Sequence, residues 1–349
     1  MRTGFAEEFR QPQEATEDDP RGFCIGGVSI EILGFRVEHD LTSHERLGAF
    51  CASVVNPDIS IEVELAHLLP SFPARQVFDS GCTWRLYEDR YGFRFDFYAA
   101  ALKGRPHKRL FIDRGFSQAR LQLSGEVREE MAFLLSPLAY PLDELLIMHR
   151  LTQERAIELH GSGIVRTNGV GNLFVGHSGA GKSTTTRLWT EREAVEVLSD
   201  DRIIVRLDEE AVPPRSDEDG TVEILRLRDG SASRNHRFAQ DDKTKDDNRR
   251  GMRMYGTPWH GEAMFASPNS APLTRIFVLE HGQGNVITRL PPSQAVSELF
   301  ARSFVPFHRH EYIESALSFL EQLTDSVPCY RYSFEPDQRA VEKILQFTD

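Results

Sequence analysis

One stretch of this chain constrains its fold more than any other: GNLFVGHSGAGKSTTTRLW, residues 171–189. A short apolar run, LFV, is followed by glycine, serine and alanine, then by one lysine and a polar, helix-favouring segment. Residues 176–183 match the pattern G-x-x-x-x-G-K-[ST] in full, and that pattern joins a strand to a helix. The stretch therefore predicts a strand that ends at the loop and a helix that begins near Lys182.

The residue types in this loop suit a phosphate group. Glycines let successive backbone N–H groups turn inward without Cβ clashes, and the helix that follows directs the positive end of its dipole at the same anion. A lysine reaches the β- and γ-phosphate oxygens, and a serine hydroxyl can enter the shell of Mg²⁺. We therefore expect a site for a nucleotide phosphate and Mg²⁺ formed by Gly176, His177, Ser178, Gly179, Ala180, Gly181, Lys182, Ser183 and Thr184.

Two neighbouring carboxylates, Asp200 and Asp201, follow the strand-like run VEVLS. Successive side chains of a strand point to opposite faces, so one carboxylate could bind the metal while the other accepts a proton from an attacking hydroxyl. The alternative is an ordinary polar turn or a salt-bridged pair. His160, at the end of the strand-like run before the loop, is a further candidate, and its alternative is a hydrogen-bonded structural histidine.

Composition limits the classes of function. At 349 residues, two domains are the default expectation, and 40% hydrophobic with 27% charged residues is typical of a globular protein. A net charge of −12 argues against nucleic acid as the main partner. An amino-terminal export signal and a run of about 18 apolar residues are both missing from the sequence, so we expect neither export nor a membrane span. Four cysteines without CxxC spacing favour reduced thiols in a cytoplasm.

The organisation along the chain changes near its first third. We expect residues 1–21 to be a loose tail and residues 22–137 to form a small β-rich domain, because strand-like alternation recurs in GVSIEILGFRV, ISIEVEL and TWRLYEDRYGFRFDFYAA. A helical stretch is predicted roughly over 126–158, broken at Pro137 and Pro141. Residues 231–251 are charged and polar, which predicts a solvated loop or a substrate-responsive lid. Later helices are expected over 293–304, 311–324 and 337–347.

In combination, LHGSGIV with His160, GHSGAGKS with Lys182 and LSDDRIIV with Asp201 resemble the catalytic domain of the HPr kinase/phosphorylase family in order and approximate spacing. The chain is similar in particular to the HPr-kinase-related proteins of bacteria, some of which accompany peptide-modification gene clusters. The resemblance covers roughly residues 138–349. It implies an α/β (α+β) fold in which a P-loop kinase domain related to phosphoenolpyruvate carboxykinase follows the β-rich domain.

The resemblance also implies an activity and roles for residues. In that family ATP donates a phosphoryl group to a serine hydroxyl on a protein, so a protein or peptide acceptor is expected here. Lys182 would bind phosphate, Ser183 would bind Mg²⁺, and Asp201 would accept the proton. Asp200 would be a supporting metal ligand or a hydrogen-bonding carboxylate, and His160 would orient Asp201 or the γ-phosphoryl group. True HPr kinases are hexamers, which implies self-association.

Two questions stay open in the sequence. YGTPWHGE, residues 255–262, resembles a segment of the related proteins, and either it supplies polar groups from His260 or Glu262 or it forms a structural turn on its glycines and proline. The function also has rivals. A small-molecule kinase or carboxykinase-like enzyme and a non-catalytic ATP-binding interaction module both use the same loop.

Overall fold

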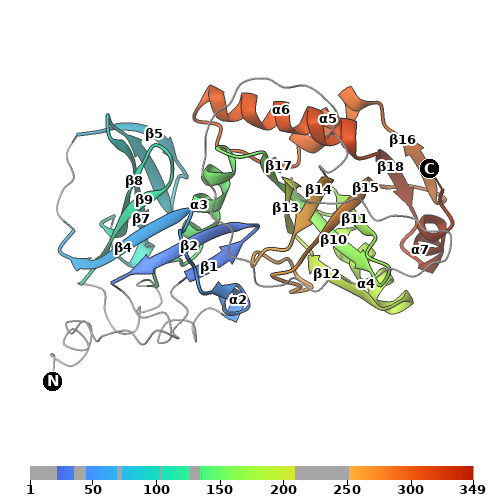
Figure 1. The fold of residues 1–349 in the computed structure, drawn as a ribbon, viewed down its shortest axis with the longest axis horizontal. Coiled ribbons are helices and arrows are strands. Elements are labelled where there is room, and N and C mark those ends of the chain that lie inside the picture. The colour runs from blue at the N-terminus through green and yellow to red at the C-terminus, as the bar shows by residue number, and fades with distance from the viewer. Residues whose placement is uncertain are drawn as a thin grey trace.

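The computed structural model has two mixed sheets, one in each half of the chain, and it describes residues 22–34, 45–68, 73–102, 104–125, 134, 136–208 and 251–348 (Figure 1). The fold is mixed α/β, as expected from the sequence. The predicted tail of residues 1–21 lies outside the described residues, and so do residues 231–250 of the predicted loop or lid.

The N-terminal sheet has the strand order β3-β1-β2-β4-β9-β8-β7-β6-β5. Its pairs are antiparallel except β2 with β4 and β4 with β9. In β4, Ile59, Ile61 and Val63 are buried on one face, which is the alternation that the sequence predicts. The strands are β1 Gly22–Ile25, β2 Val28–Leu33, β3 Cys51–Ala52, β4 Ile59–Ala66, β5 Arg75–Asp79, β6 Trp84–Glu88, β7 Gly92–Tyr98, β8 Pro106–Asp113 and β9 Gln118–Ser124.

The second sheet has the order β11-β10-β13-β14-β15-β18-β16, with β12 and β17 both paired to β10. Because β11 also pairs with β15 in parallel, five strands close into a ring of hydrogen-bonded neighbours in the order β11, β10, β13, β14 and β15. The strands are β10 Ala156–Arg166, β11 Gly171–Val175, β12 Val195–Ser199, β13 Arg202–Asp208, β14 Gly251–Tyr255, β15 Ser270–His281, β16 Val286–Arg289, β17 Ser303–Phe304 and β18 Cys329–Phe334.

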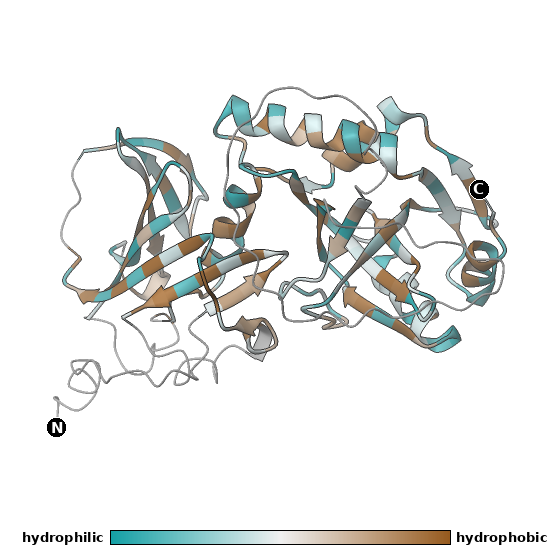
Figure 2. Ribbon diagram, in the orientation of Figure 1, coloured by the Kyte–Doolittle hydropathy of each residue, from teal (hydrophilic) through white to brown (hydrophobic). Residues whose placement is uncertain are grey.

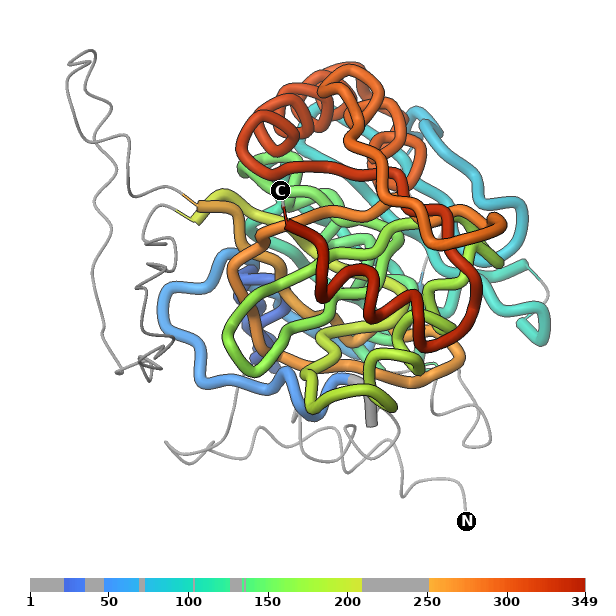
Figure 3. Tube along the Cα trace, turned by 90° about the vertical axis from the view of Figure 1, so that its right-hand side faces the viewer, coloured from blue at the N-terminus to red at the C-terminus, as the bar shows by residue number. Residues whose placement is uncertain are grey.

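Helices cover the second sheet in two groups, each with its own apolar core. Leu299 and Phe319, from α5 and α6, belong to one core, whereas Trp189 and Ile344, from α4 and α7, belong to the other. Figure 3 views the molecule from the side where α7 lies nearest. The helices are α2 Glu45–Gly48, α3 Leu142–Leu151, α4 Lys182–Arg192, α5 Pro292–Phe300, α6 His310–Ser326 and α7 Gln338–Leu345, with a 3₁₀ turn, η2, at Ala100–Leu102.

Helix α3 joins the two halves. Its apolar residues, including Leu145 and Leu146, pack in the core of the N-terminal sheet, and Ile204 and Trp259 from the second half belong to that same core. Figure 2 shows apolar residues along the strands of both sheets, and α6 alternates between polar and apolar residues as a half-buried helix does. Thus α3, which the sequence assigns to the C-terminal domain, packs with the N-terminal sheet.

Most predicted elements are confirmed, and two are corrected. The helix expected to extend to residue 158 ends at Leu151, and Ala156–Glu158 begin β10 because they pair with β13. The helix expected over 293–304 ends at Phe300, and Ser303 and Phe304 instead pair with β10. Short apolar runs such as these fit a strand or a helix equally well by periodicity. Within the described residues, helices long and apolar enough to cross a membrane are not found.

Candidate active site

The two predicted carboxylates lie at an interruption between β12 and β13. Both strands pair with β10, β13 with its first half and β12 with its second, so 195–208 runs antiparallel to β10 with a break at residues 200–201. Within the break the Gly161 amide donates to the carbonyl oxygen of Asp201 over 3.0 Å. We call residues 200–201 the acidic bulge. It lies beside the point where β10 changes partners.

The loop predicted to bind phosphate, residues 176–183 and called the phosphate loop below, begins on the other edge of the same strand. β11 pairs with β10 as far as Val175 opposite Gly161, and the Gly176 amide then donates to the carbonyl oxygen of His160 over 3.4 Å. The imidazole of His160 reaches across, placing its Nε2 2.9 Å from Oδ1 of Asp201. Strand β10 therefore brings the loop, His160 and the acidic bulge to one place, although 41 residues separate His160 from Asp201.

The two carboxylates of the bulge have different surroundings. Asp200 is 1% exposed, and its two oxygens accept the amides of Gly261 and Ala263 over 3.0 and 2.9 Å. Asp201 is half-buried and faces His160. The side chains point in different directions, as expected for neighbours in an extended segment. Of the two roles expected for Asp200, the geometry favours the hydrogen-bonding one, and Asp201 is the accessible carboxylate.

The loop has the backbone that its glycines permit. Gly179 and Gly181 have φ values of 80° and 100°, a left-handed region that other residues rarely adopt. The ammonium of Lys182 donates to the carbonyl oxygens of Gly176 and His177 over 3.0 and 3.2 Å. An ammonium has three N–H donors, so one remains for an anion. Ser178 is exposed, as are His177, Gly179 and Ser183, whereas Ala180 and Thr184 are half-buried.

Charges around the loop shift the pKa values of two of these groups. Burial raises the pKa of Asp201, but the hydrogen bond from His160 and the positive charges of Arg202 and Lys182 outweigh it, so the pKa lies below its ordinary value. Burial lowers the pKa of Lys182, and the charge of Asp201 opposes this without cancelling it. The site therefore holds an ionised carboxylate beside several cations, a setting that suits an anionic ligand.

Arg202, directly after the acidic bulge, connects Asp201 to helix α3. Its guanidinium pairs with Oδ2 of Asp201, and its Nε donates to Oε1 of Glu144 over 2.9 Å. It also stacks over the ring of Phe304, 4.0 Å from the ring centre. Neither Arg202 nor Glu144 is among the site residues that the sequence predicts. An arginine after two aspartates and a glutamate in the first turn of a helix are common on protein surfaces, so neither gave a signal.

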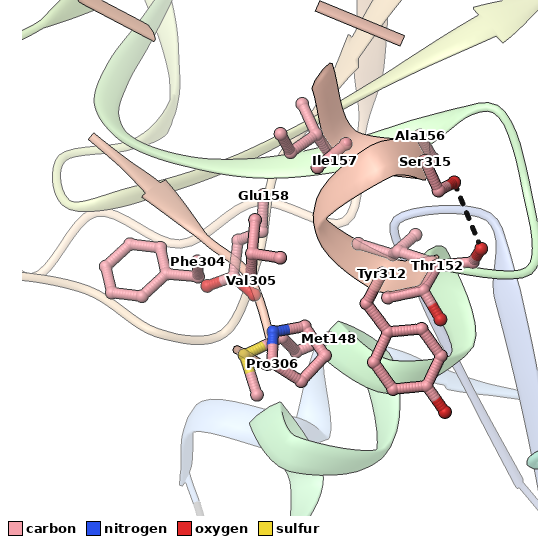
Figure 4. Close-up of a pocket in the computed structure, with 12 residues that line it drawn as sticks. Met148, Thr152, Ala156, Ile157, Glu158, Phe304, Val305, Pro306, Tyr312 and Ser315 are labelled. Atoms are coloured by element: carbon pink, nitrogen blue, oxygen red, sulfur yellow. Dashed lines mark hydrogen bonds between the residues drawn. The ribbon is translucent and has the colours of Figure 1, made fainter. Parts of the chain in front are cut away.

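A small pocket lies behind this network, lined by α3, the start of β10, residues 304–306 and α6 (Figure 4). Glu158 borders it with a side chain that is 0% exposed. Burial first, and the charge of Glu144 second, raise the pKa of Glu158 well above its ordinary value. Burial and the charge of Glu144 therefore favour the protonated form of Glu158, whereas Glu144 and Asp201 are both hydrogen-bonded to Arg202.

The 255–263 segment closes the other side of the acidic bulge. The Ser199 hydroxyl donates to the carbonyl oxygen of Trp259 over 3.2 Å, and the Trp259 indole N–H donates to Asp143 over 2.8 Å. A Cβ on Gly261 would lie 2.9 Å from Oδ2 of Asp200, so this glycine permits a close approach. His260 Nδ1 lies 3.1 Å from the carbonyl oxygen of Gly261. The segment is thus a turn held against the carboxylates.

The geometry brings together Lys182, His160 and Asp201 from the predicted site, and it adds Arg202, Glu144 and the backbone of the 255–263 segment. All four cysteines are free thiols. Comparison with models of known protein families and with curated proteins finds no match for this chain.

Proposed function

We propose that this chain is an ATP-dependent kinase that transfers the γ-phosphoryl group to a serine hydroxyl of a protein or peptide. One observation carries the proposal: a phosphate loop and an ionised Asp201 held by His160 meet at the same point of strand β10. The proposal extends to the fold, a kinase domain of the type related to phosphoenolpyruvate carboxykinase. It rests on the resemblance to HPr kinases for the choice of serine.

The proposed transfer uses groups already in place. Backbone N–H groups of the loop and the free donor of Lys182 hold the β- and γ-phosphates. The serine oxygen attacks the γ-phosphorus, the bond to the β–γ bridging oxygen breaks, and ADP leaves with that oxygen. Asp201 accepts the hydroxyl proton. His160 keeps the carboxylate oriented through the 2.9 Å hydrogen bond, so positioning contributes much of the acceleration.

The residues also fit Mg²⁺, which when bound would neutralise phosphate charge. Mg²⁺ is commonly held by one or two carboxylates together with substrate phosphates and water. The exposed Ser183 supplies one such oxygen. Each carboxylate of the acidic bulge already accepts two hydrogen bonds, Asp200 from backbone amides and Asp201 from His160 and Arg202, so either would bind the ion through a remaining lone pair. Groups of three or more His, Cys, Asp or Glu side chains suited to a metal are not found in the described part of the chain, so a site of this kind would depend on the nucleotide.

The ionisation state of Asp201 supports its role. Its carboxylate is ionised at neutral pH and can accept a proton. The lowered pKa also makes it a weaker base, so its position beside the loop supports the proposed role more than its basicity does. We propose a cytoplasmic location on the free state of the cysteines, because reduced thiols are typical of that compartment. Self-association is proposed on the resemblance alone.

The test is transfer from γ-labelled ATP with Mg²⁺ to a library of peptides that contain one serine each. We expect label on serine, and Asp201→Asn should lower kcat by about 10²- to 10⁴-fold while ATP affinity is retained. Lys182→Ala should lose ATP affinity as well. Lys343→Ala, an exposed lysine on α7, is the matched control and should behave like the parent.

Each rival function gives a different result in the same experiment. Label on a metabolite and never on a peptide would indicate a small-molecule kinase. ATP binding without transfer to any acceptor would indicate an interaction module. If Asp201→Asn transferred phosphate at the parent rate, the assignment of the proton acceptor would be wrong.

A further inference from the structure

Two neighbouring acidic residues at the start of α3 point at the candidate active site. Asp143 and Glu144 are 4% and 8% exposed. Oδ2 of Asp143 accepts the indole N–H of Trp259 over 2.8 Å, and Oε1 of Glu144 accepts Nε of Arg202 over 2.9 Å. Acidic residues in a first helical turn usually stabilise the helix dipole from the surface. These two are buried and bonded to residues 116 and 58 positions away, so the dipole does not account for them.

Each contact leads to one carboxylate of the acidic bulge. Trp259 belongs to the 255–263 segment, whose Gly261 and Ala263 amides hold Asp200. Arg202 pairs directly with Asp201. Helix α3 is therefore connected to both carboxylates. Asp143 is hydrogen-bonded to Trp259, whose segment holds Asp200 through the Gly261 and Ala263 amides. Glu144 is hydrogen-bonded to Arg202, which pairs with Asp201.

The opposite side of α3 is fixed in the N-terminal half. Leu142, Leu145 and Leu146 are at most 5% exposed and belong to the core of the N-terminal sheet. Trp259 packs in the same core with 4% exposure. A helix buried on one side and bonded on the other has little freedom to shift without moving the bulge.

We propose that Asp143 and Glu144 are positioning residues that set the acidic bulge against the phosphate loop, and that the N-terminal sheet thereby takes part in phosphoryl transfer. The proposal rests on the proposed function for its kinetic consequence, and on the contacts of α3 for its structural one. Neither residue touches the reacting atoms. Their effect on the rate comes from the position of Asp201.

The kinetic test uses variants that remove the hydrogen bond between Asp143 and Trp259 from one side or the other. We expect Asp143→Ala and Trp259→Phe each to lower kcat about tenfold with KM for ATP unchanged, since small misplacements at a reacting centre have effects of this order. The double variant should lose clearly less than the two single variants combined, because both delete the same bond. Asp143→Asn keeps an oxygen acceptor and should restore most of the rate. Two variants of Glu144 test its contact with Arg202 in the same way. Glu144→Ala deletes the hydrogen bond, and Glu144→Gln keeps an oxygen acceptor.

A structural role alone would give another pattern. Additive losses in the double variant, or losses of kcat matched by weaker ATP binding, would overturn the proposal. If Asp143→Ala fails to fold, Trp259→Phe and Asp143→Asn decide the matter, because they retain an aromatic ring and an acceptor.

A second measurement separates this proposal from the proposed function. Amide hydrogen exchange reports the Gly261 and Ala263 amides without any catalysis. Faster exchange over 259–263 in Trp259→Phe, with exchange in 176–183 unchanged, supports the positioning role even if the parent transfers no phosphate to any acceptor. Parent-like exchange over 259–263 in Trp259→Phe would overturn it, even if the parent is a kinase.

Discussion

The phosphate loop and the 255–263 segment both border the acidic bulge, but they are held there in different ways. Lys182 and the loop carbonyls that it bonds are five and six residues apart. The hydrogen bonds that join the 255–263 segment to the acidic bulge and its neighbours span 55 to 116 residues, from Arg202 to Asp143. The loop takes its backbone shape largely from its own glycines and Lys182, with His281 bonded to Gly179 and the Phe334 ring beside Gly181, whereas the segment is positioned by distant partners. The difference explains why the loop matches a general sequence pattern, whereas the role of the segment stays open in the sequence.

The largest effect is expected from a substitution in the phosphate loop. In Gly181→Ala the new Cβ would meet the Phe334 ring at 2.6 Å in a residue with φ of 100°. The left-handed backbone and the clash together cost about 3 kcal/mol, which predicts roughly a 100-fold weaker Kd for ATP. Titration calorimetry with ATP and Mg²⁺ measures the change.

The matched control is Gly179→Ala. Its φ of 80° imposes a similar backbone strain, but a Cβ there has no neighbour within 4 Å. We expect about a tenfold loss from conformation alone. Equal losses in the two variants would mean that contact with Phe334 does not shape the loop.

A smaller effect is expected from Gly261→Ala, which perturbs the 255–263 segment. The added Cβ would lie 2.9 Å from Oδ2 of Asp200 and 3.5 Å from Cβ of Asp201, so the segment must move away. We predict about a tenfold lower kcat with unchanged ATP affinity, measured in the same transfer and titration assays. Gly125→Ala has open space around its Cβ and serves as the control. A loss of ATP affinity in Gly261→Ala would show that the segment acts on the loop and not on the carboxylates.

The local features of the molecule could be predicted from the sequence. The strand β11, the loop and α4 follow from glycine positions and apolar spacing, and the hairpin of β6 and β7 follows from alternation around a polar turn. The sequence predicts that Asp201 and the loop belong to one site, but it does not predict how the two are brought together. Its 2.9 Å bond to His160 depends on the pairing of β10 with β13, which periodicity does not specify.

The long-range contacts could not be predicted, for a physical reason. Acidic residues such as Asp143 and Glu144 are common in the first turn of a helix, so their residue types do not predict their partners. Their hydrogen bonds to Trp259 and Arg202 form only in the folded chain. Asp200 and Asp201 are chemically identical, yet backbone amides from the 255–263 segment bury one and leave the other accessible. Such differences arise from partners that the chain meets only after folding.

The smallest expected effect is on acid stability, and it tests whether the bulge holds an ionised Asp201. The folded pKa of Asp201 lies below its unfolded value because the hydrogen bond from His160 and nearby cations outweigh burial, which by itself raises it. A lowered folded pKa contributes stability above the unfolded value of about 4, and this contribution disappears as the pH falls through the folded pKa. In Asp201→Asn the free energy of unfolding should therefore fall less steeply from pH 5 to pH 3. The difference should be at most about 1 kcal/mol, because the side chain is 26% exposed.

Urea unfolding at several pH values measures this difference, with Asp325→Asn, which changes an exposed carboxylate on α6, as the control. Parallel pH profiles for Asp201→Asn and the parent would mean that His160 and the neighbouring cations do not favour the ionised form of Asp201 in the folded protein.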